Sequence, residues 1–88
     1  MAILPQKPMK GTVVAVSKDG KTAVVQTVFG QFSVLEIKDK NSLAKGGLVR
    51  GYLESTGKET IGNVSKNTLV NVSFLQTKAT RGEVKDLL

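Results

Sequence analysis

The feature that most constrains this chain is a series of six short segments with the alternation of β-strands, separated by turn residues. Asp19-Gly20 follows the first segment, and Asp-Gly is among the strongest hairpin signals. Gly30-Gln31 separates the second and third segments, so we expect the first three to form an antiparallel meander. The expected strands are residues 10–17, 22–29, 32–38, 48–55, 59–64 and 68–76.

Six strands laid flat would leave open edges, and closure into a barrel removes them. We therefore expect an all-β fold, a small five- to six-stranded barrel, in a single domain of 88 residues. The expected organisation is an N-terminal arm (1–9), a β-barrel domain (10–76) and a charged C-terminal tail (77–88). Segment 39–47 is polar and predicts a connecting loop with at most one helical turn. Residues 83–88 predict a short C-terminal helix.

Alternation along the expected strands assigns side chains to faces. The core-facing residues of segment 68–76 are Val70, Val72 and Phe74. Segment 48–55 places Val49, Gly51 and Leu53 toward the core and Arg50, Tyr52 and Glu54 outward. Segment 22–29 carries apolar residues on both faces, so the sequence leaves its core face undecided.

The composition excludes most catalytic chemistry. The chain contains no histidine and no cysteine, which removes imidazole bases, thiol nucleophiles and the usual zinc ligands. We therefore expect a protein that is not an enzyme and needs no cofactor or metal. The lack of cysteine fits a cytoplasmic protein. No apolar stretch approaches the roughly 20 residues of a membrane span, so no membrane partner is expected.

The charge favours an anionic partner. Thirteen Lys and Arg residues against seven Asp and Glu residues give a net charge of +6. Nucleic acid could exploit such a field. A small domain also commonly carries a net charge of about 2–8 for solubility alone, so the charge by itself does not decide between the two interpretations.

Four short motifs resemble the OB-fold, and within it the cold-shock and S1-like domains. They are residues 10–13 (KGTV), 32–37 (FSVLEI), 43–51 (LAKGGLVRG) and 60–65 (TIGNVS). The resemblance spans roughly residues 10–65 and implies an OB-like barrel, with an SH3-like barrel as the alternative. Segment 68–76 is additional to a five-stranded barrel. The second strand lacks the aromatic residues with which cold-shock domains stack bases, and only Phe32 occupies a comparable position.

The resemblance and the charge together predict a module that binds single-stranded DNA or RNA through a basic face. The candidate stacking residues are Phe29, Phe32 and Tyr52. The candidate phosphate contacts are Lys10, Lys18, Lys21, Lys38, Lys45 and Arg50. Core packing is the other interpretation of Phe29 and Phe32, which flank a tight turn. Tyr52 is the stronger candidate because it shares a polar face with Arg50 and Glu54.

The alternative function is a protein-interaction or assembly module, such as a homodimer or an adaptor. Apolar residues on the second faces of segments 22–29 and 68–76 would supply a dry interface. They are Val24, Val28, Leu69 and Leu75. Burial beneath the arm or the tail would explain the same residues without a partner.

Overall fold

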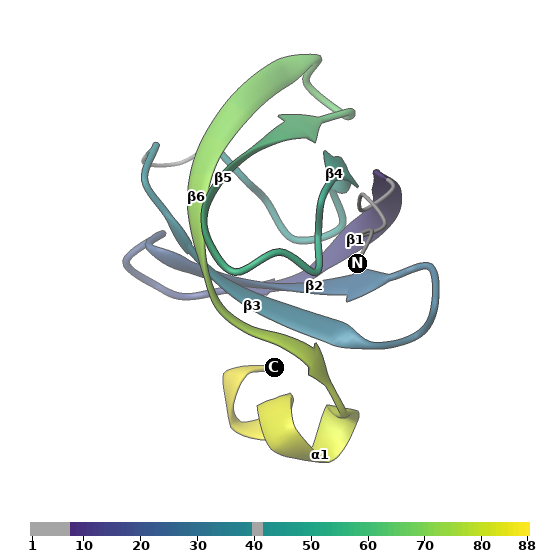
Figure 1. Cartoon of the computed structure of the whole chain (residues 1–88). Coiled ribbons are helices and arrows are strands. Elements are labelled where there is room, and N and C mark those ends of the chain that lie inside the picture. Colours follow the sequence, from purple (N-terminus) through teal and green to yellow (C-terminus); the bar gives the residue numbers. More distant parts are fainter. Residues whose placement is uncertain (1–7, 40–41) are drawn as a thin grey trace, which may run out of the picture.

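The computed structural model describes residues 8–39 and 42–88, which form a closed antiparallel barrel (Figure 1). Its strands are β1 (Met9–Val16), β2 (Thr22–Thr27), β3 (Phe32–Ile37), β4 (Leu48–Gly51), β5 (Gly57–Asn63) and β6 (Thr68–Ala79). Around the barrel the order is β1, β2, β3, β6, β5 and β4, and β4 closes the barrel by pairing with β1. The prediction of an all-β barrel is confirmed.

The barrel consists of two meanders, β1–β2–β3 and β4–β5–β6. The sixth strand lies between β3 and β5, so this barrel has one strand more than the five-stranded OB-fold. The connection from β3 to β4 carries Leu43, which is buried in the barrel core. The expected arm lies outside the described residues except for Pro8 and Met9. No helix among the described residues is long and apolar enough to cross a membrane.

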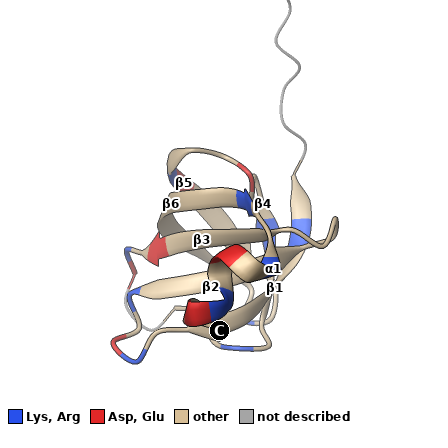
Figure 2. Cartoon of the chain, turned by 90° about the horizontal axis from the view of Figure 1, so that it is seen from below, with Lys and Arg blue, Asp and Glu red and all other residues tan. Residues whose placement is uncertain are grey.

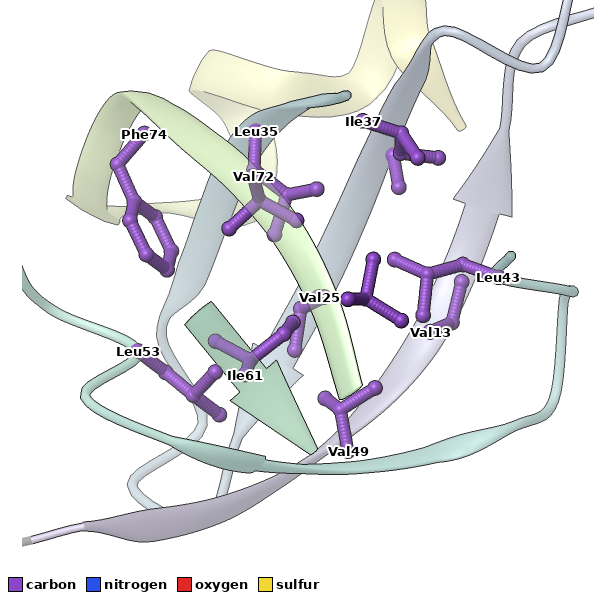
Figure 3. Close-up of a cluster of buried hydrophobic side chains, with 12 residues drawn as sticks. Val13, Val25, Leu35, Ile37, Leu43, Val49, Leu53, Ile61, Val72 and Phe74 are labelled. Atoms are coloured by element: carbon purple, nitrogen blue, oxygen red, sulfur yellow. The ribbon is translucent and has the colours of Figure 1, made fainter. Parts of the chain in front are cut away.

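The interior of the barrel is filled by the inward residues of every strand, as alternation predicts (Figure 3). Fully buried members include Val13, Val25, Leu35, Val49, Ile61, Val70 and Val72. In Figure 3, Leu43 and Leu53 reach this cluster from opposite sides. Each such side chain contributes about 1.5–3 kcal/mol by leaving water, which is large for a domain of this size.

A second, smaller core lies outside the barrel, on the outer face of β2 and β3. The C-terminal helix α1 (Arg81–Val84) and the 3₁₀ turn η1 (Lys85–Leu87) follow β6, and Figure 2 shows α1 lying across β2 and β3. The buried residues of this second core are Ala15, Val24, Phe32, Val34, Ala79 and Val84. A capping box starts the helix, because Thr80 and Glu83 each bond the other's backbone N–H.

Several strand boundaries differ from the prediction by one or two residues, and the ends of β4 and β6 differ by more. β4 ends at Gly51 because the chain then turns and sends Leu53 into the barrel, where Ser33 Oγ donates to the Leu53 carbonyl at 2.6 Å. The alternation that predicted a longer strand continues through this loop without strand pairing. β6 extends to Ala79, which pairs with Phe32 and leads into the helix.

Candidate nucleic-acid interface

The part of the outer face of β2 and β3 that carries Val24, Phe32 and Val34 is not available to a ligand. Strands 2 and 3 form the face on which OB-folds bind oligonucleotides, but here α1 covers them. Phe32 is only 2% exposed, and the Arg81 guanidinium lies 5.2 Å from the centre of its ring. Phe32 is therefore a core residue, and its role as a base-stacking residue is corrected, because Val84 and Ala79 pack over it.

Phe29 has the opposite environment. It lies in the turn between β2 and β3, where Gly30 N–H bonds the Thr27 carbonyl, and 70% of it is exposed. The backbone of the turn, rather than packing of the ring, fixes its position. Phe29 thus remains accessible, although no described cation lies on it in a cation–π contact.

The open outer face is built by β1, β4, β5 and β6. Strand pairing places Lys10 opposite Arg50, Arg50 opposite Gly62, and Gly62 opposite Leu69. Residues opposite each other in neighbouring strands point to the same side of a sheet, about 5 Å apart. These four residues, here called the cross-strand row, therefore form one continuous line across the outside of the barrel.

The charge on these four strands is strongly one-sided. Each strand carries one exposed cation, namely Lys10, Arg50, Lys58 and Lys78. Their one carboxylate is Glu59, which is half-buried, lies opposite the core residue Val72 and accepts a hydrogen bond from Ser55 at 3.0 Å. Lys10, Arg50 and Lys58 therefore occupy outward positions of β1, β4 and β5. Carboxylates lie near the β5–β6 part of this face, because Glu59 follows Lys58 and Asp39 accepts a hydrogen bond from the Asn71 N–H of β6.

Two shallow hollows follow the cross-strand row. The Arg50 hollow is lined by Pro8, Arg50, Gly51, Thr60, Gly62, Asn63, Val64, Asn67, Thr68 and Leu69. The Lys10 hollow is lined by Lys10, Gly11, Thr12, Gln26, Thr27, Val28 and Leu48. The charged side chain in each is a cation, so both hollows suit an anion that also brings apolar surface.

A third hollow surrounds Tyr52, which is 40% exposed. It is lined by Lys38, Tyr52, Lys58, Glu59, Thr60, Asn71 and Val72. Thr60 Oγ1 donates to Asn71 Oδ1 at 2.8 Å, which fixes the Asn71 side chain at the surface. Because Thr60 also lines the Arg50 hollow, the two hollows are neighbours along β5. Tyr52, the strongest stacking candidate in the sequence, thus lies beside two lysines.

The remaining predicted lysines lie elsewhere. Lys18 and Lys21 flank the turn from β1 to β2, and eight residues of extended chain separate Lys10 from Lys18, a span of up to about 26 Å. Lys45 lies in the connection before β4. Among the described residues, none of the three lines the Arg50 hollow or the Lys10 hollow, so they do not belong to the same site.

Two carboxylates near that turn are held in their charged form. Ser17 and the Lys21 backbone N–H bond Asp19 and lower its pKa. The salt bridge from Lys38 lowers the pKa of Glu36, with a smaller contribution from Lys21. Lys38 therefore has an acidic neighbour, which weakens its field toward the Tyr52 hollow.

Sequence reasoning missed four residues of the open face, namely Lys58, Thr60, Gly62 and Asn71, and it named Leu69 only for a protein interface. Alternation within segment 59–64 was sufficient to place Thr60 and Gly62 outward, opposite the inward Ile61. What the sequence lacked was the pairing of β5 with both β4 and β6, which places them beside Arg50 and Leu69.

The chain matches no protein-family model, no curated protein and no solved structure at a significant level. The assignment of a function therefore depends on the chemistry of these residues.

Proposed function

We propose that this protein binds single-stranded nucleic acid, without catalysing a reaction, on the outer face of β1, β4, β5 and β6. The observation that carries the proposal is the pattern of charge on this face. Exposed cations occupy outward positions of β1, β4 and β5, namely Lys10, Arg50 and Lys58. The one carboxylate on the four strands, Glu59, is half-buried and lies opposite the core residue Val72, although it also lines the Tyr52 hollow. A chain of phosphates is the partner that such a face fits best.

Lys10 and Arg50 are the central phosphate contacts of the proposed site. They lie directly opposite each other on neighbouring strands, where like charges repel and destabilise the pair. The described residues give neither side chain a salt bridge. A phosphate between the two would replace this repulsion with attraction and release the counterions condensed on the nucleic acid.

Tyr52 supplies the stacking surface. Binding of single strands without sequence readout combines a cationic groove with aromatic rings, because every base has a flat π-face. Tyr52 lies half-exposed in a hollow that also contains Lys38 and Lys58, so a base on the ring would bring its phosphate within reach of a cation. The two neighbouring hollows share Thr60, so the strand would run along β5 from Tyr52 to Arg50.

The test is a titration of labelled single-stranded DNA and RNA at low and at physiological salt. We expect saturable binding that weakens with salt. Arg50→Glu should reduce the affinity at low salt by about tenfold or more, and Arg50→Ala should lower the salt slope by about 1. Lys85→Glu, on the exposed face of the C-terminal turn, makes the same change in net charge and is the matched control.

Equal losses in Arg50→Glu and Lys85→Glu would show that net charge, and not this face, attracts the oligonucleotide. Absence of binding by the unmodified protein at low salt would contradict the proposal as a whole. Tyr52→Ala should weaken binding to both oligonucleotides with little change in the salt slope, because it removes stacking and leaves the cations in place.

A second function, self-association or binding of a protein partner, is favoured by apolar side chains that remain exposed. Leu69 is 76% exposed and Leu75 is 61% exposed, and both lie on β6. Light scattering of the protein without nucleic acid tests this function. A mass above that of the monomer, unchanged in Arg50→Glu, would favour assembly over nucleic-acid binding.

A cytoplasmic location is part of the same proposal. The chain contains no cysteine, as is common where disulfide bonds do not form. Imaging of a fluorescently tagged chain tests this location.

A further inference from the structure

Gly62 is a strand glycine that the fold does not require. It lies inside β5, where glycine weakens a strand because it gains no packing and loses the most conformational freedom. Its backbone is not in the left-handed region. A Cβ built on it would meet a single described atom outside its chain neighbours within 4 Å, the Arg50 carbonyl oxygen at an ordinary 3.5 Å. A side chain would therefore fit at this position.

At other glycines of the barrel, the structure explains why no larger residue is present. A Cβ on Gly11 would lie 2.7 Å from Val25, and one on Gly51 would lie 3.0 Å from Ile61. The turn glycines adopt positive φ angles that other residues avoid: Gly20, Gly30, Gly46 and Gly57. The contrast indicates that the missing side chain of Gly62 serves something outside the barrel.

The missing side chain leaves a recess in the cross-strand row. Gly62 forms part of the Arg50 hollow, with Arg50 on one side and Leu69 on the other. Since strands are spaced about 4.8 Å apart, about 10 Å separates the backbones of these two flanking residues. Leu69 is exposed over 76% of its surface, whereas the next outward positions of β6 hold the polar residues Asn71 and Ser73.

We propose that one nucleobase of a bound single strand lies on the backbone of Gly62, between Arg50 and Leu69. A base has a flat apolar face for Leu69 and a π-system on which a planar guanidinium stacks. Its phosphate reaches the pair formed by Lys10 and Arg50. A free phosphate would need the cations but would gain nothing from Leu69 or from the recess. This inference rests on the proposed nucleic-acid binding.

The test compares two labelled probes on the protein and on variants that fill the recess. The probes are a single-stranded oligonucleotide and an abasic oligomer with the same number of phosphates, at one low salt concentration. The protein should bind the oligonucleotide about 30-fold more tightly than the abasic oligomer, through bases at Tyr52 and Gly62 that each contribute about fivefold. In Tyr52→Ala, the preference that remains, about fivefold, reports the Gly62 recess.

Gly62→Val in the Tyr52→Ala background should abolish this remaining preference and leave the affinity for the abasic oligomer unchanged. Valine suits strands, so the barrel should form normally, which urea unfolding checks. Gly62→Ala, the smaller change, should reduce the preference partly. Gly82→Ala is the matched control, because a Cβ there would meet only Thr80 Oγ1 at 3.9 Å, in the C-terminal helix.

Three results would overturn the inference, and they are distinguishable. If Gly62→Val and Gly62→Ala keep the preference for bases, the recess holds no base although nucleic-acid binding stands. If both variants lose affinity for both probes equally, the recess supports phosphate contacts alone. If the unmodified protein binds neither probe, the proposed function fails and the inference fails with it.

Discussion

The outer face of β2 and β3 and the outer face of β4, β5 and β6 belong to one barrel wall but have opposite environments. On the first, Val24, Phe32 and Val34 point outward and α1 buries them. On the second, Arg50, Gly62 and Leu69 point outward and remain open. The same alternation of side chains builds both faces, so alternation alone does not distinguish a covered face from a free one.

The difference depends on the segment after β6. Because β6 continues to Ala79, it delivers α1 to the outer face of β3, and Val84 then supplies the apolar cover. The covered face thereby gains a second core, which contributes stability. The open face keeps exposed cations and hollows, so under the proposed function stability and binding belong to different sides of the barrel.

The largest expected effect separates the two phenylalanines that flank the turn from β2 to β3. Phe32→Ala removes a ring that is 2% exposed, and we expect a loss of about 3–5 kcal/mol in the free energy of unfolding. Phe29→Ala removes a ring that is 70% exposed and should change that free energy by about 0.5 kcal/mol or less. Urea unfolding measures both.

Equal stability of Phe32→Ala and Phe29→Ala would contradict the difference between the two faces, because α1 would then not form a core over β3. For binding of single strands, we expect no effect of the buried ring. Phe32→Ala should leave the affinity of the folded protein for single strands unchanged, since Phe32 is remote from the open face.

A smaller effect concerns two buried hydroxyl groups, those of Thr27 on β2 and Ser33 on β3. Ser33 Oγ bonds the Leu53 carbonyl beside Tyr52, so Ser33→Ala should cost about 1–3 kcal/mol by leaving that carbonyl unpaired. Thr27 Oγ1 is buried without a partner among the described residues, so Thr27→Val should stabilise the protein by about 1 kcal/mol. Thermal unfolding gives the sign of each change, and effects of the same sign would show that one of these two environments is wrong.

The smallest effect concerns the charged turn between β1 and β2, far from the cross-strand row. The pKa of Asp19 lies below its ordinary value of 3.8, mainly because Ser17 bonds the carboxylate. A lowered pKa stabilises the folded state above the unfolded value, and this contribution is lost as the pH falls through the folded value. Asp19→Asn should therefore make stability slightly less dependent on pH below about 4.

Carboxyl titration by NMR, together with unfolding at several pH values, measures this effect. A pKa of Asp19 at or above 3.8 would contradict the bonded turn. In Ser17→Ala the pKa should move back toward its ordinary value, while binding of oligonucleotides should not change.

Much of the fold could be predicted because its signals are local. The turns at Asp19-Gly20 and Gly30-Gln31 and the inward set on β6 depend on neighbouring residues, and the structure places both as expected. The candidate site was harder to predict from the sequence. Arg50 and Tyr52 were correctly placed outward, but Gly62 and Leu69 join Arg50 only through pairing between strands that are distant in sequence.

By itself, the sequence determined the number and type of strands, the inward faces of β4 and β6 and the excess of positive charge, since periodicity, turn chemistry and composition are properties of short segments. The tertiary structure alone decided that β6 lies between β3 and β5, that α1 buries Phe32, and that Lys10, Arg50, Gly62 and Leu69 form one row. The physical reason is that the hydrophobic effect has no direction, so an apolar face of a strand can pack inside the barrel or against a segment outside it. Contacts between residues that are distant in the sequence decide which of the two occurs.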